Sequence, residues 1–103
     1  MASSKEYLHY VQSQCPAGTT YRAMMGEYIL YYQGKVFGGI YDDRFLIKPV
    51  KAAIDRMPDA VYEPPYDGAK PMLLVDRLDE REFLQELIQA MYAQLPAPKK
   101  KGR

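Results

Sequence analysis

The sequence predicts an α+β domain in which an antiparallel meander sheet of about five strands has helices packed on one face, in the order α-β-β-β(-β)-α-β-α. The main observation is a run rich in Tyr and Ile, residues 21–48, broken only by two-residue turns typical of β-hairpins. Capping patterns followed by apolar stripes indicate helices at both ends of the chain. Four prolines within residues 58–71 exclude regular structure for most of that stretch.

The first helix is expected to start near the N-terminus. Ser3 and Glu6 have the spacing of a capping box, and Leu8, Val11 and Cys15 follow at helical intervals as a narrow apolar stripe. The Pro-Ala-Gly sequence after Cys15 should end this helix. Strands are then expected at residues 19–25, 27–32, 35–41 and 44–48, with a bend at Gly26 and turns at Gln33-Gly34 and Asp42-Asp43.

Two-residue loops fix the register of the strands and predict which side chains share a face. One face carries no charge and is predicted to be the core side: Ile29, Tyr31, Val36, Gly38, Ile40, Phe45 and Ile47. The opposite face also holds Leu30, Gly39 and Leu46, and mixes aromatic rings with cations. Its predicted interaction residues are Tyr28, Tyr32, Lys35, Phe37, Tyr41, Arg44 and Lys48.

The second half of the chain should supply two helices and one strand. Pro49 suits the first turn of a short helix, with Val50, Ala53, Ile54 and Met57 on its apolar side. Residues 58–71 are expected to form an ordered loop held by Val61, Tyr62 and Tyr66, and residues 72–75 a short strand. In the last helix, Asp79 and Glu82 suggest a capping box and Leu78 and Phe83 a hydrophobic staple. Its apolar stripe is Phe83, Leu84, Leu87, Ile88, Met91 and Leu95.

Composition and charge indicate one domain, residues 1–95, followed by a flexible basic tail, residues 96–103. Four of the fourteen cations lie in the last five residues, so that without them the formal net charge of +1 becomes −3. This weakens the case for binding nucleic acid through the charge of the domain. A single cysteine and the lack of a long apolar run lead us to expect a cytoplasmic protein with no membrane contact.

No set of residues suggests catalysis, a metal or another cofactor. His9 and Cys15 face different directions on one helix, so they should not form a catalytic pair. The Asp42-Asp43 pair could join Glu27 or Asp76 in a metal or acid/base site, but turn chemistry explains it better. We interpret Cys15 as a packed thiol, because nothing nearby would lower its pKa.

The mixed face of rings and cations leaves several possibilities open. It could bind a second copy of the chain, lie under the chain's own loop, or contact another protein. Alternatively, its tyrosines and cations could bind single-stranded nucleic acid by base stacking, together with Arg22 and the basic tail. A small-ligand or enzymatic function is a further alternative, and it would require a pocket that gathers tyrosines and carboxylates.

Three segments carry a family resemblance: Tyr21-Arg22-Ala23-Met24-Met25-Gly26-Glu27-Tyr28, Tyr32-Gln33-Gly34-Lys35, and Asp42-Asp43-Arg44 before Leu46 and Lys48. Through these residues the chain resembles the TfoX/Sxy N-terminal domain, and the resemblance covers nearly its whole length. The resemblance implies a sheet of about five antiparallel strands flanked by helices. It also implies a link to bacterial competence and transcription regulation, although the C-terminal domain of the full-length regulators is absent from this sequence. We therefore expect a non-enzymatic regulatory domain that acts through protein contacts, as a homodimer.

Overall fold

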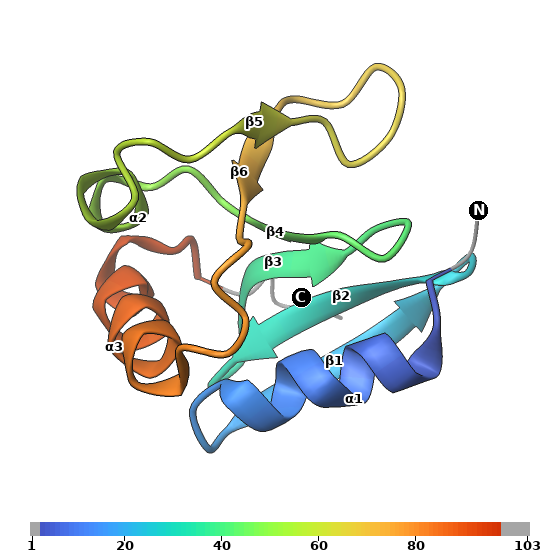
Figure 1. Cartoon of the computed structure of the whole chain (residues 1–103), viewed down its shortest axis with the longest axis horizontal. Helices are drawn as coiled ribbons and strands as arrows, with labels where there is room; N and C mark the ends of the chain where they lie inside the picture. Colours follow the sequence, from blue (N-terminus) through green and yellow to red (C-terminus); the bar gives the residue numbers. More distant parts are fainter. Residues whose placement is uncertain (1–2, 98–103) are drawn as a thin grey trace, which may run out of the picture.

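The computed structural model describes residues 3–97, and its α+β architecture confirms the predicted fold class. Six strands are present where about five were expected, because a two-residue strand lies within the proline-rich stretch. Most of the expected tail, residues 98–103, lies outside the described residues. The elements shown in Figure 1 are α1 (Lys5–Gln14), β1 (Thr19–Met24), β2 (Glu27–Tyr32), β3 (Lys35–Ile40), β4 (Phe45–Ile47), α2 (Lys51–Arg56), β5 (Tyr62–Glu63), β6 (Met72–Leu74), α3 (Arg81–Met91) and the 3₁₀ turn η1 (Tyr92–Gln94).

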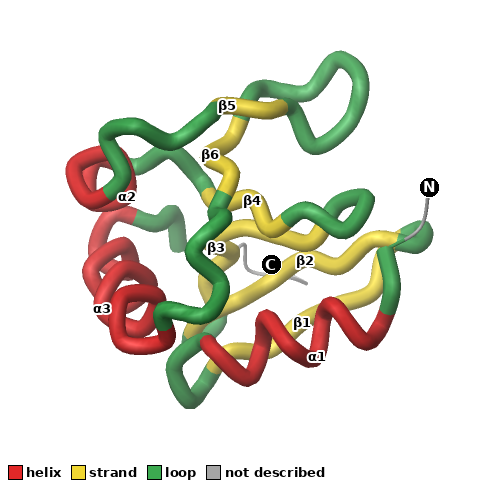
Figure 2. Tube along the Cα trace, in the orientation of Figure 1, coloured by secondary structure: helices red, strands yellow, loops and turns green. Residues whose placement is uncertain are grey.

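The six strands form one antiparallel sheet in the order β1-β2-β3-β4-β6-β5 (Figure 2). Three consecutive hairpins build its first four strands, with Met25-Gly26, Gln33-Gly34 and Asp42-Asp43 as their turns. Both central residues of each turn have positive φ, the geometry that matches the right-handed twist of paired strands. The last two turns were predicted, whereas only a bend was expected at Gly26.

Helices cover one face of this sheet, which we call the core face. In Figure 1, α1 runs beside β1 and β2, while α2 and α3 lie next to each other. The buried stripe of α3 was predicted correctly, and it packs with side chains from β2, β3, β4 and β6. The fully buried members of this core include Leu8, Val11, Leu30, Phe37, Ile40, Phe45, Ile47, Leu84, Leu87, Ile88 and Met91.

The predicted assignment of faces is correct for β4 and wrong for β2 and the start of β3. A β-bulge is the reason: Leu30 pairs with Gly38 but Tyr31 pairs with Val36, so Phe37 is an extra residue in β3. This one-residue shift places Tyr28, Leu30, Tyr32 and Phe37 on the core face. It places Ile29, Tyr31 and Val36 on the opposite face, which we call the outer face. Ile40, Phe45 and Ile47 are on the core face as predicted.

The helix boundaries differ locally from the predicted caps. Ser4, and not Ser3, caps α1 by accepting a hydrogen bond from the Tyr7 amide at 3.1 Å. The N-cap of α3 is Glu80, which makes no side-chain capping bond, so the Asp79 capping box is wrong. Ile54 on α2 is exposed and Ala52 faces the core in its place, whereas Ala53 and Met57 are buried as predicted. None of the helices within residues 3–97 has the length and apolarity needed to cross a bilayer.

Candidate functional site

The seven predicted interaction residues are divided between the two faces of the sheet. Tyr28, Tyr32 and Phe37 lie on the core face, and the exposed fractions of Tyr32 and Phe37 are only 7% and 0%. Lys35 is also on that side, where its ammonium donates to the Tyr92 carbonyl at 3.2 Å and sits 4.2 Å from the centre of the Tyr92 ring. Because the bulge does not affect the second half of β3 or β4, Tyr41, Arg44 and Lys48 remain on the outer face, flanking Gly39 and Leu46.

The outer face has two parts with different surroundings. Over β1 and β2, four neighbouring side chains form what we call the open patch: Arg22, Met24, Ile29 and Tyr31. Ile29 and Tyr31 are half-buried, and Met24 is 49% exposed. None of the four belongs to the hydrophobic core cluster. Over β3 and β4, by contrast, the chain's own loop approaches the sheet.

This loop, residues 64–71, extends beyond β5 at the upper right of Figure 1. Arg44 holds its start by three hydrogen bonds and is itself held by a fourth. The guanidinium donates to Glu63 Oε1 at 2.7 Å and to the carbonyls of Pro64 and Pro65 at 3.3 Å, and Nε donates to the Tyr41 carbonyl at 3.1 Å. Planar Arg is suited to this fork-like arrangement of acceptors. Arg44 and the buried Pro65 therefore fix the loop, whereas the expected anchors Val61, Tyr62 and Tyr66 are all exposed.

Between the loop and the sheet lies a hollow of about 640 Å³, which we call the groove. Val36, Tyr41 and Lys48 line it from the sheet and Met72 from β6, while Tyr62, Pro65, Tyr66, Lys70 and Pro71 line it from β5 and the loop. A second hollow of about 320 Å³, lined by Met24, Met25 and Glu27, adjoins it. Tyr41, Pro65 and Tyr66 line both hollows and form the wall that they share.

A glycine positions this shared wall. A Cβ atom added to Gly39 would lie 2.6 Å from the Tyr41 ring and 2.7 Å from the Tyr28 carbonyl oxygen, so only glycine lets the ring lie against the strand. The Tyr41 and Tyr66 ring centres are 6.5 Å apart. Burial raises the pKa of Tyr41, and Tyr66 and Glu27 shift it in the same direction. The Tyr41 side chain is therefore neutral at physiological pH, and Gly39 holds its ring in place as part of the groove wall.

The charged side chains among the described lining residues of the groove are both cationic, while the carboxylate Glu27 lines the adjoining hollow. Lys48 and Lys70 are among its lining residues, and none of the described lining residues is Asp or Glu. Within residues 3–97, neither lysine forms an ion pair. The sequence prediction included Tyr41 and Lys48 but missed Tyr66 and Lys70 as partners, because no periodic pattern indicates how a proline-rich loop folds back.

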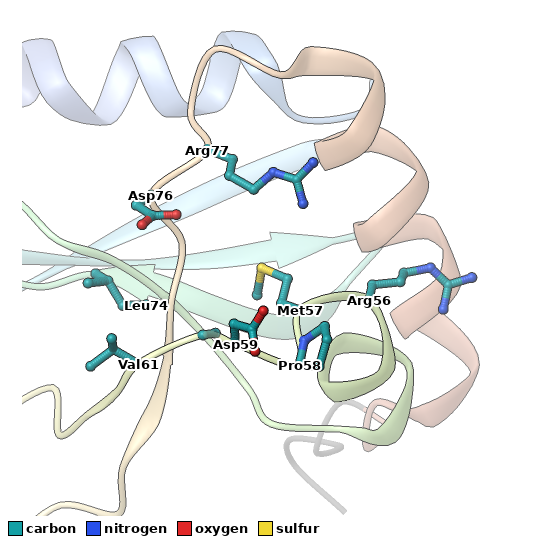
Figure 3. A pocket seen from close by; sticks show the side chains of 9 residues that line it. Arg56, Met57, Pro58, Asp59, Val61, Leu74, Asp76 and Arg77 are labelled. Carbon is teal, nitrogen blue, oxygen red and sulfur yellow. The ribbon is translucent and has the colours of Figure 1, made fainter.

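A third hollow, of about 300 Å³, lies between α2, β6 and the segment before α3 (Figure 3). Arg56, Asp59, Asp76 and Arg77 line it. Both arginines have acidic partners: Arg56 binds Glu86 on α3 at 2.8 Å, and Arg77 binds Glu80 at 2.5 Å. Arg77 also stacks on the Phe83 ring, 3.8 Å from its centre. Both arginines among the described residues that line this hollow are therefore engaged in ion pairs.

The Asp42-Asp43 pair has a structural role, as turn chemistry predicted. Glu27 Oε1 accepts from the Ser3 hydroxyl at 2.6 Å and from the Asp42 amide at 3.0 Å. Asp43 Oδ1 accepts from the Ser4 amide at 2.8 Å. These bonds tie the start of α1 to the β1–β2 and β3–β4 turns. In the described part of the chain, no three His, Cys, Asp or Glu residues are grouped to hold a metal ion.

The candidate nucleophile Cys15 and the candidate base His9 are not among the described residues that line the groove. Cys15 is 5% exposed, and burial raises the pKa of its thiol to about 12, which leaves no reactive thiolate at neutral pH. His9 is exposed on α1, where its ring meets the edge of Tyr21 at 6.3 Å between centres.

The fold and the groove define a small α+β domain with helices on one face of its sheet and a loop-covered hollow on the other. The chain belongs to the same family as the uncharacterized 12.7 kDa protein in the trpE 5′ region of Spirochaeta aurantia. The two are 35% identical over 102 residues, which cover 96% of this chain and 89% of the relative. No family model and no solved structure matches the chain.

Proposed function

We propose that the protein is a non-enzymatic bacterial regulatory domain of the cytoplasm that acts through protein contacts, and that a second copy of the chain binds its open patch. The proposal rests on the difference between the two faces of the sheet, of which only the core face is covered by helices. Helices bury the core face, but Met24, Ile29 and Tyr31 on the outer face lie outside the core cluster. Apolar side chains gathered on one surface are typical of protein interfaces.

A second copy is the partner that this geometry favours. Three of the four patch residues are apolar or aromatic and the fourth is Arg22, with Thr20 and Glu27 as cross-strand neighbours on the same face. Dimer interfaces of identical chains are more apolar than other contacts. The patch also reaches β1, which is an edge strand of the sheet. An edge strand beside an apolar face can contact its own symmetry mate through both features. The regulatory part of the proposal rests on the resemblance to the TfoX/Sxy N-terminal domain.

Light scattering over a dilution series tests the association directly. We expect a dimer at high micromolar concentration and a monomer on dilution. The substitution Tyr31→Glu should lower the association constant at least about tenfold, since it puts a charge within the patch. Tyr10→Glu is the matched control, because Tyr10 is an exposed tyrosine on α1 and its replacement should leave association unchanged. A strict monomer at every concentration would rule out self-association.

Nucleic-acid binding receives less support from the arrangement of the face. Three of the aromatic rings proposed for base stacking, Tyr28, Tyr32 and Phe37, lie on the core face. Arg44 is engaged with Glu63 and the loop. An electrophoretic shift with single-stranded DNA at low salt, lost on raising the salt, would favour this alternative over protein contacts.

A further inference from the structure

We propose that the groove between β3–β4 and the loop is a binding site for a small aromatic anion, such as an arylcarboxylate. The ring would lie beside Tyr41 and Tyr66, and the charged group would pair with Lys48 and Lys70. This inference goes beyond the protein contact proposed above, which uses the open patch over β1 and β2. The two surfaces share no residue, so each can be tested without the other.

The size and rigidity of the groove suit a small molecule. Its volume of about 640 Å³ lies within the range of ligand pockets, about 300–1,000 Å³. Its walls are held in place before any ligand binds, because Arg44 fixes the start of the loop and the absent Cβ of Gly39 seats the Tyr41 ring. A preformed site loses less conformational entropy on binding than a flexible one.

The lining residues favour a planar apolar group. Tyr41, Tyr62 and Tyr66 present aromatic rings, while Val36 and Met72 add aliphatic and thioether surface. Aromatic rings pair favourably in offset or edge-to-face arrangements, and the Tyr41 and Tyr66 rings are tilted by 58° to each other. A ligand ring can therefore contact the face of one tyrosine and the edge of the other.

The charges favour an anion over a cation or a neutral ligand. The chain without its last five residues has a formal net charge of −3, yet the described lining of the groove has two lysines and no carboxylate. Because neither lysine is ion-paired within residues 3–97, both are available to a ligand. A hydrogen bond between an ammonium and a carboxylate is about twice as strong as one between neutral groups.

The first test titrates naphthalene-2-carboxylate into the ¹⁵N-labelled full chain and follows the amide resonances. We expect saturable shifts at Val36, Tyr41 and Tyr66. Naphthalene-2-carboxamide has the same shape without the charge, and it should bind roughly tenfold more weakly because it loses a charge-assisted bond. Shifts confined to residues outside the groove, no saturation at millimolar ligand, or equal affinity for the two compounds would each overturn the proposal.

The second test compares two double variants that lose the same charge. Lys48→Gln with Lys70→Gln should lower the affinity for the carboxylate about tenfold or more. Lys5→Gln with Lys51→Gln removes two exposed lysines outside the groove and should leave the affinity unchanged. Equal losses in both variants would mean that only net charge matters, which contradicts a defined site. Tyr31→Ala, which removes the patch ring without adding a charge beside Val36, should weaken the dimer but not ligand binding, so failure of the groove and failure of the dimer are separable.

Discussion

The same strands build the core face and the outer face of the sheet, but the apolar side chains on the two faces are buried to different extents. On the core face, Leu30, Phe37 and Ile40 are fully buried against the helices. On the outer face, the neighbouring residues Ile29, Tyr31 and Val36 are only half-buried. Composition does not separate the two sets, because both are apolar. The comparison shows that strand register decides which apolar side chains form the core. Here the single extra residue Phe37 sets that register.

The strongest test of this contrast places a carboxylate on each face. Ile40→Asp should cost about 4 kcal/mol or more and unfold the domain, because it buries an unpaired charge at a fully buried position. Ile29→Asp, on the half-buried outer face, should cost about 1 kcal/mol. Urea denaturation followed by circular dichroism measures both values. Similar losses in the two variants would show that the outer face is as buried as the core.

The close approach of β3 to β4, directly after the bulge, can be tested at Gly38. A Cβ atom at this position would lie 2.2 Å from the Leu46 carbonyl oxygen and 2.9 Å from the Ile47 Cα, so the strands would have to separate. We expect Gly38→Ala to cost about 2–4 kcal/mol in unfolding free energy. Gly68→Ala is the control: its φ is +86° but its Cβ position is open, so about 1 kcal/mol of backbone strain is expected. Thermal melting of both variants checks the order of these effects.

The buried thiol of Cys15 makes the stability of the core depend on pH. Its folded pKa of about 12 lies above the unfolded value of 9.0, so this contribution is complete below pH 9 and is lost as the pH rises toward 12. Each pH unit in that window should lower the unfolding free energy by about 1.4 kcal/mol. Between pH 9 and 11 the wild type should lose about 2 kcal/mol more than Cys15→Ala. Parallel losses in the two proteins would indicate an exposed thiol.

The smallest effect is expected on the outer face, at the arginine that holds the loop. Arg44→Ala should cost only about 1 kcal/mol, because its ion pair with Glu63 is partly solvated. Its local effect should be larger: the Ala69 amide, which bonds to the Tyr66 carbonyl, should exchange hydrogen faster once the loop is released. Hydrogen exchange monitored by mass spectrometry measures this. Unchanged exchange over residues 64–71 would show that Arg44 does not fix the loop.

Local signals in the sequence predicted the parts of the fold that depend on local interactions. The hairpin turns at Gln33-Gly34 and Asp42-Asp43 and the apolar stripe of α3 follow from turn and helix preferences, and they are confirmed. The adjacent glycines Gly38-Gly39 are typical of a bulge or of a helix that approaches the strand closely, and a bulge is present beside them. The identity of the extra residue was not predictable from the pattern, because Val36 and Phe37 are both apolar and either could face the core.

The candidate site was predicted only in part for a similar reason. Tyr41, Arg44 and Lys48 were identified because they share one face of two neighbouring strands whose register the Asp42-Asp43 turn fixes. The contribution of Tyr66 and Lys70 depends on how residues 64–71 fold back, which follows from tertiary contacts of Arg44 with backbone carbonyls. No local preference encodes such contacts, so the groove became visible only with the structure.

The unfolding free energies of Tyr31→Glu and Tyr32→Glu, measured side by side at monomeric concentration, test the assignment of the two faces most directly. Tyr32 is 7% exposed and packs edge-to-face on Tyr92 at 5.8 Å, so its replacement should cost about 3 kcal/mol. Tyr31 lies one position away on the outer face, and its replacement should cost about 1 kcal/mol or less. Equal losses, or a larger loss for Tyr31, would contradict the bulge and the faces built on it.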